Sequence, residues 1–125
     1  MKRLFSLILA ISLTTPLFAQ DDNAQAKALI RDGRCADAIA PLQKVSKAKF
    51  KTHAGAQASV MLTECYLREH KRDEAMQLAS RFLEYHVGSE YRERMELAHA
   101  IVMVESGAVY EGVEAMLRIL AYTKN

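Results

Sequence analysis

The chain contains no tryptophan, only two prolines and only five glycines in its 125 residues. Proline and glycine are the residues that interrupt helices, so their scarcity leaves long stretches in which nothing breaks a helix. No Gly/Ser-rich segment divides the chain and no low-complexity tract occurs. The apolar residues recur at helical spacing rather than in alternation, which argues against a β fold. We therefore expect one all-α domain.

The only long apolar run lies at the N-terminus. Lys2 and Arg3 precede residues 4–13, a stretch of apolar residues broken by two serines, and Ala19 offers a small residue at a cleavage point. This order is typical of a secretory signal. The run has about ten residues, whereas a bilayer span needs about 20. We expect cleavage of residues 1–19, and a retained membrane anchor is the alternative.

Removal of the signal changes the charge balance. The whole chain has 17 basic and 15 acidic residues, and two of the basic ones lie in the signal, so residues 20–125 are formally neutral. A neutral chain without a stripe of interleaved basic and aromatic residues argues against a nucleic-acid partner. We expect a periplasmic or secreted protein with no stable membrane span after cleavage.

Two cysteines, Cys35 and Cys65, remain after cleavage. Exported proteins meet an oxidising environment, and an even number of cysteines permits one disulfide between this pair. The alternative is two buried thiols that pack as small apolar side chains. Neither cysteine directly follows Ala19, so we do not expect a lipid anchor.

One spacing dominates the rest of the chain, because small residues recur every 37 positions at Ala38, Ala75 and Gly112. Other sets keep the same interval: Leu29, Tyr66 and Met103; Val45, Phe82 and Ile119; Ala26, Thr63 and Ala100; Gly33, His70 and Gly107. A fixed period in this range predicts a solenoid, in which each unit packs on its neighbours. Small residues allow two helices to cross closely, so we assign the first set to such crossings.

The repeat predicts three antiparallel helix pairs. The first helices are expected at about 22–32, 53–69 and 90–106, and the second helices at about 36–47, 73–86 and 109–122. The three repeats then occupy about 20–51, 52–88 and 89–125.

Local signals mark several helix ends. Gly33 and Gly107 supply the left-handed residue that ends many helices, and His70 takes the same place in the second repeat. Asp73 is expected to cap or charge the start of one helix, and Ser89 to start another. Pro41 is expected inside its helix, where it removes one backbone hydrogen bond.

These turns resemble a known family. Residues 32–39 (DGRCADAI) are similar to the turn and second-helix start of a tetratricopeptide repeat. Residues 62–75 (LTECYLREHKRDEA) look like a fuller copy, and residues 107–113 (GAVYEGV) like a weaker one. The first-helix Trp and the closing Pro of that family are absent, and its usual period is 34. A Sel1-like unit is the alternative subtype.

The resemblance implies a concave groove lined by the first helices, whose outward residues hold a peptide. Phasing the repeats assigns these residues to the groove: Lys27, Ile30, Arg31, Val60, Glu64, Leu67, Arg68, Leu97, Ile101, Val104 and Glu105. They form an apolar stripe edged by charge, a pattern typical of a partner site. The alternative is that neighbouring chain covers these side chains.

The sequence offers little for catalysis. No histidine stands at metal-ligand spacing from another histidine or a cysteine, and there is no CxxC, GxSxG or phosphate-binding glycine loop. We expect no enzyme activity, no cofactor and no metal. The alternative is a repeat-type hydrolase built from His53, His86 or His99.

The expected function is therefore that of a protein-binding or assembly scaffold in a bacterial periplasm or envelope, with a protein or peptide partner. An alternative is a homo-oligomer formed through the last helix. That helix carries Met116, Ile119, Leu120 and Tyr122 with no capping helix after it, and solenoid ends normally need a polar cap.

Overall fold

The computed structural model describes residues 21–123, and six helices occupy most of this range. They are α2 (Ala24–Arg31), α3 (Cys35–Ala48), α4 (His53–Arg68), α5 (Arg72–Tyr85), α6 (Arg92–Glu105) and α7 (Val109–Thr123). No strand occurs among the described residues, and the expected all-α fold is confirmed. The helix bounds agree with the expected ranges to within two residues. The expected signal, residues 1–19, lies outside the described part of the chain.

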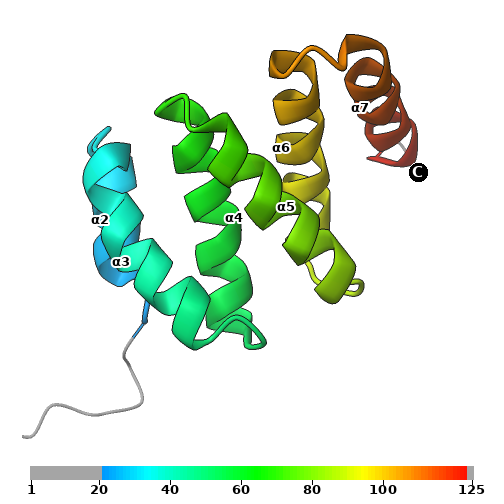
Figure 1. The fold of residues 1–125 in the computed structure, drawn as a ribbon. Helices are drawn as coiled ribbons and strands as arrows, with labels where there is room; N and C mark the ends of the chain where they lie inside the picture. The colour runs from blue at the N-terminus through cyan, green and yellow to red at the C-terminus, as the bar shows by residue number, and fades with distance from the viewer. Residues whose placement is uncertain (1–20, 124–125) are drawn as a thin grey trace, which may run out of the picture.

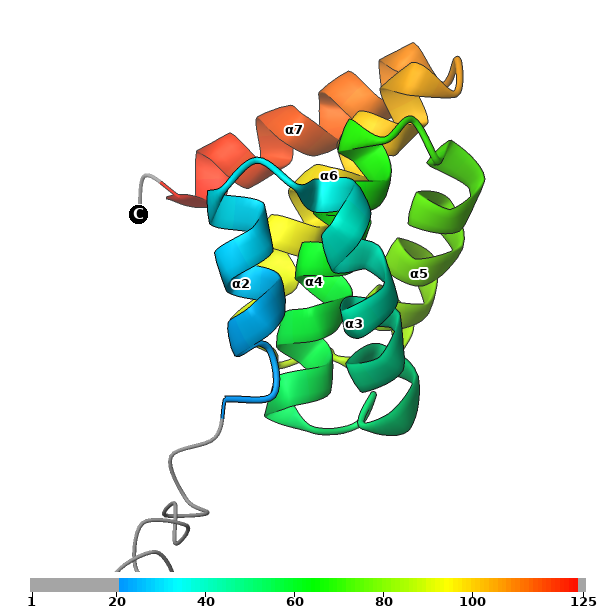
Figure 2. The ribbon, with the colours of Figure 1, turned by 90° about the vertical axis from the view of Figure 1, so that its left-hand side faces the viewer.

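The helices follow one another across the molecule in chain order (Figure 1). Each helix packs on the next one in the sequence, and α4 also packs on α6. Figure 2 shows α7 along one edge of the molecule, with no helix on its outer side, in agreement with its terminal place in Figure 1.

Three left-handed residues make the tight turns. The backbone angle φ is 76° at Gly33, 59° at His70 and 99° at Gly107. The next N–H in each turn donates back to a carbonyl five residues earlier, from Arg34 to Leu29, from Lys71 to Tyr66 and from Ala108 to Met103, over 2.8–2.9 Å. These bonds are those of the Schellman motif. The expected turns are thus confirmed, including the one in which histidine replaces glycine.

The small residues of the repeat lie where helices meet closely. Ala38 and Ala75 are completely buried. A Cβ added to Gly112 would lie 2.5 Å from Cγ2 of Val104 and 2.8 Å from the carbonyl oxygen of Ala100. A larger residue in α7 would therefore push it away from α6.

The core consists of two apolar clusters. The first joins α2, α3, α4, α5 and α6 around the two cysteines and Leu42, and the second joins α4, α5 and α6 around Val60, Phe82 and Met95. Half-buried Leu67 of α4 packs against both. Helix α4 packs on α3, α5 and α6, so it is the central helix of the molecule.

Polar contacts within this interior are few, and the buried Oδ1 of Asn23 has no partner within the described residues. Ser46 of α3 and Ser59 of α4 share a buried hydrogen bond of 2.7 Å, and Ser59 also donates to the carbonyl of Gly55 over 2.7 Å. Asn23, before α2, donates its amide to the carbonyl of Ala54 and to the side chain of Gln57. These bonds fix α2 and α3 against α4.

One expected helix start needs correction, and of the two roles expected of Asp73 one is confirmed. Helix α6 begins at Arg92 rather than near Ser89, because the Ser89 hydroxyl accepts the N–H of Tyr91 over 3.1 Å and so stabilises the turn before the helix. Asp73 lies inside the first turn of α5, which follows Lys71, so it contributes charge near the helix start rather than a cap. Pro41 lies within α3 as expected.

A disulfide joins Cys35 and Cys65, with their Cα atoms 5.2 Å apart. It links the first residue of α3 to the last turn of α4, and both cysteines are buried in the first cluster. The disulfide that the sequence permitted is therefore present, and it closes a sequence separation of 30 residues.

Gly55 predicts a test of the turn before α4. A Cβ at this position would overlap the carbonyl oxygen of Lys49, so Gly55→Ala requires backbone movement and should destabilise the protein by about 1–3 kcal/mol. Gly88→Ala is the matched control, because a Cβ there meets nothing within 4 Å, and its effect should stay within about 0.5 kcal/mol. Chemical denaturation measures both, and equal effects would contradict the close approach.

The disulfide predicts a second stability change. Replacement of both cysteines by alanine releases the closed loop and should lower the free energy of unfolding by about 3–4 kcal/mol in the chain-entropy model. Chemical denaturation of the oxidised protein and of the double variant gives the difference. Reduction of the parent protein provides the control, since reducing agent should destabilise the parent and leave the double variant unchanged.

Candidate binding groove

A surface hollow of about 510 Å³ crosses three helices, α2, α4 and α6. Its lining consists of Ile30, Glu64, Leu67, Arg68, Arg94, Leu97, Ala98 and Ile101. A smaller hollow of about 140 Å³ shares four of these residues and extends to Lys27, Met61 and the two disulfide-bonded cysteines. We call the two hollows together the groove.

The apolar part of the groove comes from one face of each helix. Ile30, Leu67 and Ile101 are half-buried, and Leu97 is 43% exposed. Leu97 and Ile101 stand four residues apart on α6 and therefore share a helix face. The groove thus offers apolar side chains that are accessible to a ligand and are held by the core beneath them.

Charged groups border this apolar strip. The Glu64 carboxylate of α4 accepts two hydrogen bonds from Arg94 of α6, from Nη2 over 2.5 Å and from Nε over 3.4 Å. Arg68 is exposed, and its Nη1 lies 3.9 Å from Sγ of Cys35. Within residues 21–123 Arg68 forms no ion pair, so its guanidinium retains donors for a ligand.

Most of the expected groove residues come together in the structure. The larger hollow includes Ile30, Glu64, Leu67, Arg68, Leu97 and Ile101, and the smaller one includes Lys27. The Lys27 ammonium pairs with Asp21, and this pairing, through a hydrogen bond, holds the pKa of the Asp21 carboxyl below its usual value.

Three other expected residues lie outside both hollows. Arg31 and Glu105 are exposed near helix ends, and the Glu105 carbonyl accepts a hydrogen bond from Arg72. Val104 is half-buried and contacts α7 at Gly112. Their repeat phase matches the groove, but Arg31 and Glu105 lie at helix ends and Val104 packs against the next helix.

The placement of Val60 on the groove surface is wrong. Val60 is completely buried in the second cluster with Phe82 and Met95. The physical reason is the packing of α6 on α4, which covers this side of α4. Leu97, the same position one repeat later, stays partly exposed.

The sequence reasoning missed Arg94 as part of the groove. Within α6, Arg92 pairs with Glu96 at 2.9 Å. Arg94 instead pairs across to α4. A signal was available, because Arg94 precedes Leu97 by three residues and Ile101 by seven, which places it on the same helix face.

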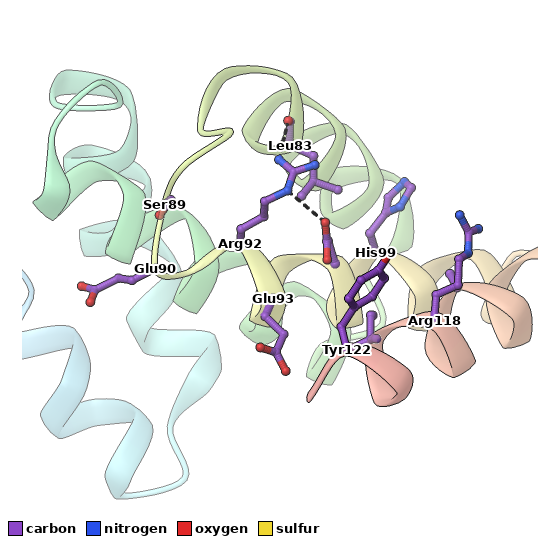
Figure 3. Close-up of a pocket in the computed structure, with 11 residues that line it drawn as sticks. Leu83, Ser89, Glu90, Arg92, Glu93, His99, Arg118 and Tyr122 are labelled. Carbon is purple, nitrogen blue, oxygen red and sulfur yellow. Dashed lines mark hydrogen bonds and ion pairs between the residues drawn. The ribbon is translucent and has the colours of Figure 1, made fainter. Parts of the chain in front are cut away.

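Outside the groove, a separate hollow of about 590 Å³ lies between α5, α6 and α7, and Figure 3 shows its lining. Arg92 crosses one end, where it donates to the carbonyl of Leu83 over 3.0 Å and pairs with Glu96. His99 and Tyr122 face it from α6 and α7. Burial lowers the pKa of the half-buried His99 imidazole, because the charged form loses solvation.

His53 and His86, the other two histidines considered for the alternative hydrolase, each contact a different segment of the chain. His53 pairs with Glu90 at 3.4 Å and shares a hydrogen bond with Tyr91. Burial, followed by the charge of Glu90, raises the pKa of the Tyr91 phenol. The Nε2 atom of His86 lies 2.8 Å from the carbonyl oxygen of Phe50, so Nε2 carries the proton.

Within residues 21–123, no three His, Cys, Asp or Glu side chains are placed to hold a metal ion. In the same part of the chain, no helix combines the length and the apolar character that a membrane crossing requires.

Comparisons with protein-family models, with curated proteins and with solved structures found no match. The groove is therefore interpreted from its geometry and chemistry.

His99 predicts a pH effect on stability. Its folded-state pKa lies below the unfolded value of 6.5, so the unfolded chain binds this proton more readily, and stability falls as the pH drops through about 6.5 towards the folded-state pKa. His99→Leu removes the effect and supplies the residue type found one repeat earlier, at Leu62. Thermal unfolding at pH 7.5 and 5.0 should show a smaller loss of Tm in the variant. An equal loss in both proteins would contradict this assignment.

Proposed function

We propose that the six helices form three repeats of a short, tetratricopeptide-like α-solenoid. The support comes from the three Schellman turns at Gly33, His70 and Gly107 and from the buried small residues that follow each turn by five positions. Each feature recurs every 37 residues, and each has the same local role. In such an arrangement the first helices of the pairs lie side by side.

We infer that the protein binds a segment of another protein or a peptide in the groove, without catalysis. The observation that carries this proposal is the hollow that crosses α2, α4 and α6, helices separated by one helix each in the sequence. A hollow shared by three helices matches the reach of an extended or helical segment better than that of a small molecule held by one element.

The chemistry of the groove restricts the ligand. Ile30, Leu97 and Ile101 favour apolar side chains, which would supply most of the affinity. Arg68 favours an acidic group close to them, and the ion pair between Glu64 and Arg94 would restrict the direction of the bound segment. The expected ligand is thus a segment with apolar residues and at least one carboxylate.

The disulfide supports export to an oxidising compartment. Structural disulfides persist mainly in secreted and periplasmic proteins. Cys35 and Cys65 also line the smaller hollow, so the oxidised protein is the form in which the groove is complete. Together with the expected signal at residues 1–19, this favours the periplasm or the cell exterior.

The groove is tested by Leu97→Glu. Leu97 is a better choice than Leu67, since Leu67 packs against both core clusters and its replacement would also destabilise the protein. Peptides selected from a random library displayed on phage serve as the ligand. We expect Leu97→Glu to weaken binding of the selected peptides at least about tenfold, equivalent to about 1.4 kcal/mol, because it places a carboxylate on the apolar strip.

Val87→Glu is the matched control. Val87 is exposed in the connection between α5 and α6 and lines neither hollow of the groove. This variant should bind the selected peptides as the parent does, and both variants should keep the parent's helical circular dichroism. Equal binding by the parent and Leu97→Glu would place the working surface elsewhere.

A further inference from the structure

The hollow between α5, α6 and α7, which we call the α7 hollow, has the size of a small-molecule site. Its volume of about 590 Å³ lies within the range of ligand pockets, about 300–1,000 Å³. None of the residues that line it lines the groove. Several of its charged residues already have partners, Glu96 with Arg92 at 2.9 Å and Glu90 with His53 at 3.4 Å. These four residues therefore offer little charge to a ligand.

Glu93 of α6 and Arg118 of α7 also line the α7 hollow, and their charges remain free. Both are exposed, and neither forms an ion pair within residues 21–123. The Thr123 hydroxyl lies 3.4 Å from the Glu93 carboxylate, but it donates its proton to the carbonyl oxygen of Ile119 over 2.5 Å. The carboxylate of Glu93 and the guanidinium of Arg118 thus keep their hydrogen-bonding capacity for a ligand.

The register of α6 and α7 places these two charges at different ends of the hollow. The helices are antiparallel, because Gly112 of α7 lies against Val104 whereas Thr123 lies against Glu93. Arg118 precedes Thr123 by five residues, so it stands about 7.5 Å along the helix axis from the level of Glu93. Each side chain tilts towards the N-terminus of its own helix, so the two charged groups tilt apart. The hollow therefore has a negative end and a positive end.

An apolar wall separates the two ends. Figure 3 shows Tyr122 of α7 between Glu93 and Arg118. The Tyr122 side chain is 81% exposed although it lines the hollow, so one face of the ring is open to a ligand. Half-buried Leu83 of α5 and Ile119 of α7 complete the apolar lining. A ligand that reaches both charges must therefore carry an apolar segment between its own charged groups.

We propose that the α7 hollow binds ω-aminocarboxylates, molecules in which a methylene chain separates an ammonium group from a carboxylate. The carboxylate accepts hydrogen bonds from Arg118, the ammonium group donates to Glu93, and the methylene chain lies on the ring of Tyr122. A chain of about five methylene groups has a length similar to the separation along the helices. A free ω-amino acid and the C-terminal lysine of a peptide both present this chemistry.

The ligand ε-aminocaproate tests the proposal by NMR titration of protein produced from the complete sequence, at constant ionic strength. Its contacts are few and near solvent, so we expect saturable shifts of α6 and α7 amides with a Kd on the order of 1 mM. Caproate lacks the ammonium group and hexylamine lacks the carboxylate, so each should bind at least about tenfold more weakly. Equal binding of either, or shifts that never saturate, would overturn the proposal.

Variants assign the two ends of the hollow. Arg118→Gln should reduce binding of ε-aminocaproate to the level of hexylamine, and Glu93→Gln should reduce it to the level of caproate. Glu114→Gln is the matched control, because Glu114 is exposed on α7 but does not line the hollow. This control and Leu97→Glu, which changes the groove, should bind ε-aminocaproate as the parent does. All four variants should keep the parent's circular dichroism, and parent-like binding by Arg118→Gln or Glu93→Gln would contradict the assigned contacts.

The source of the ligand is decided with a pair of peptides that end in lysine, one with a free C-terminal carboxylate and one with a C-terminal amide. Binding of the free acid alone would assign the hollow to peptide ends. Binding of ε-aminocaproate but of neither peptide would assign it to free ω-amino acids. An amidated peptide that binds as tightly as the free acid would overturn the role of Arg118 and with it the proposal.

Discussion

The close approach of successive helices at Ala38, Ala75 and Gly112 is the constraint on which the rest of the structure depends. Each of these residues follows a left-handed turn by five positions, so the chain reverses and then crosses its neighbour at a fixed point. A larger side chain at Gly112 would collide with Val104 and with the backbone of α6. With this spacing fixed, the core side chains meet and the hollow across α2, α4 and α6 forms between them.

Position along the chain decides whether an equivalent residue is core or surface. Val60 is buried because α6 packs on α4, whereas Leu97 at the same phase borders the groove. Leu120 is exposed, whereas Leu83 at the same phase packs in the second cluster. Leu97 and Leu120 are thus exposed for one physical reason, the absence of a further helix pair after α7 within the described residues.

Several features of the candidate site were predictable from sequence, and others were not. The 37-residue register and helical spacing together were enough to assign Ile30, Leu67 and Ile101 to one surface, because helical spacing fixes which residues share a face. Val104, the 37-residue equivalent of Ile30 and Leu67, packs against α7 instead. The register failed for Val60, since burial depends on which helix covers a face and not on phase alone. The pairing of Arg94 with Glu64 was missed for a related reason, because a long side chain chooses among partners that only the packed helices bring within reach.

The sequence by itself determined the all-α fold, the helix limits to within two residues, the three left-handed turns and the small residues at the crossings. These follow from local backbone preference and from periodicity, which are properties of short segments. Only the tertiary structure decided that Cys35 faces Cys65, that α6 covers Val60 and that Leu120 remains exposed. Each of these depends on the distance and direction between segments remote in sequence, which no local pattern specifies.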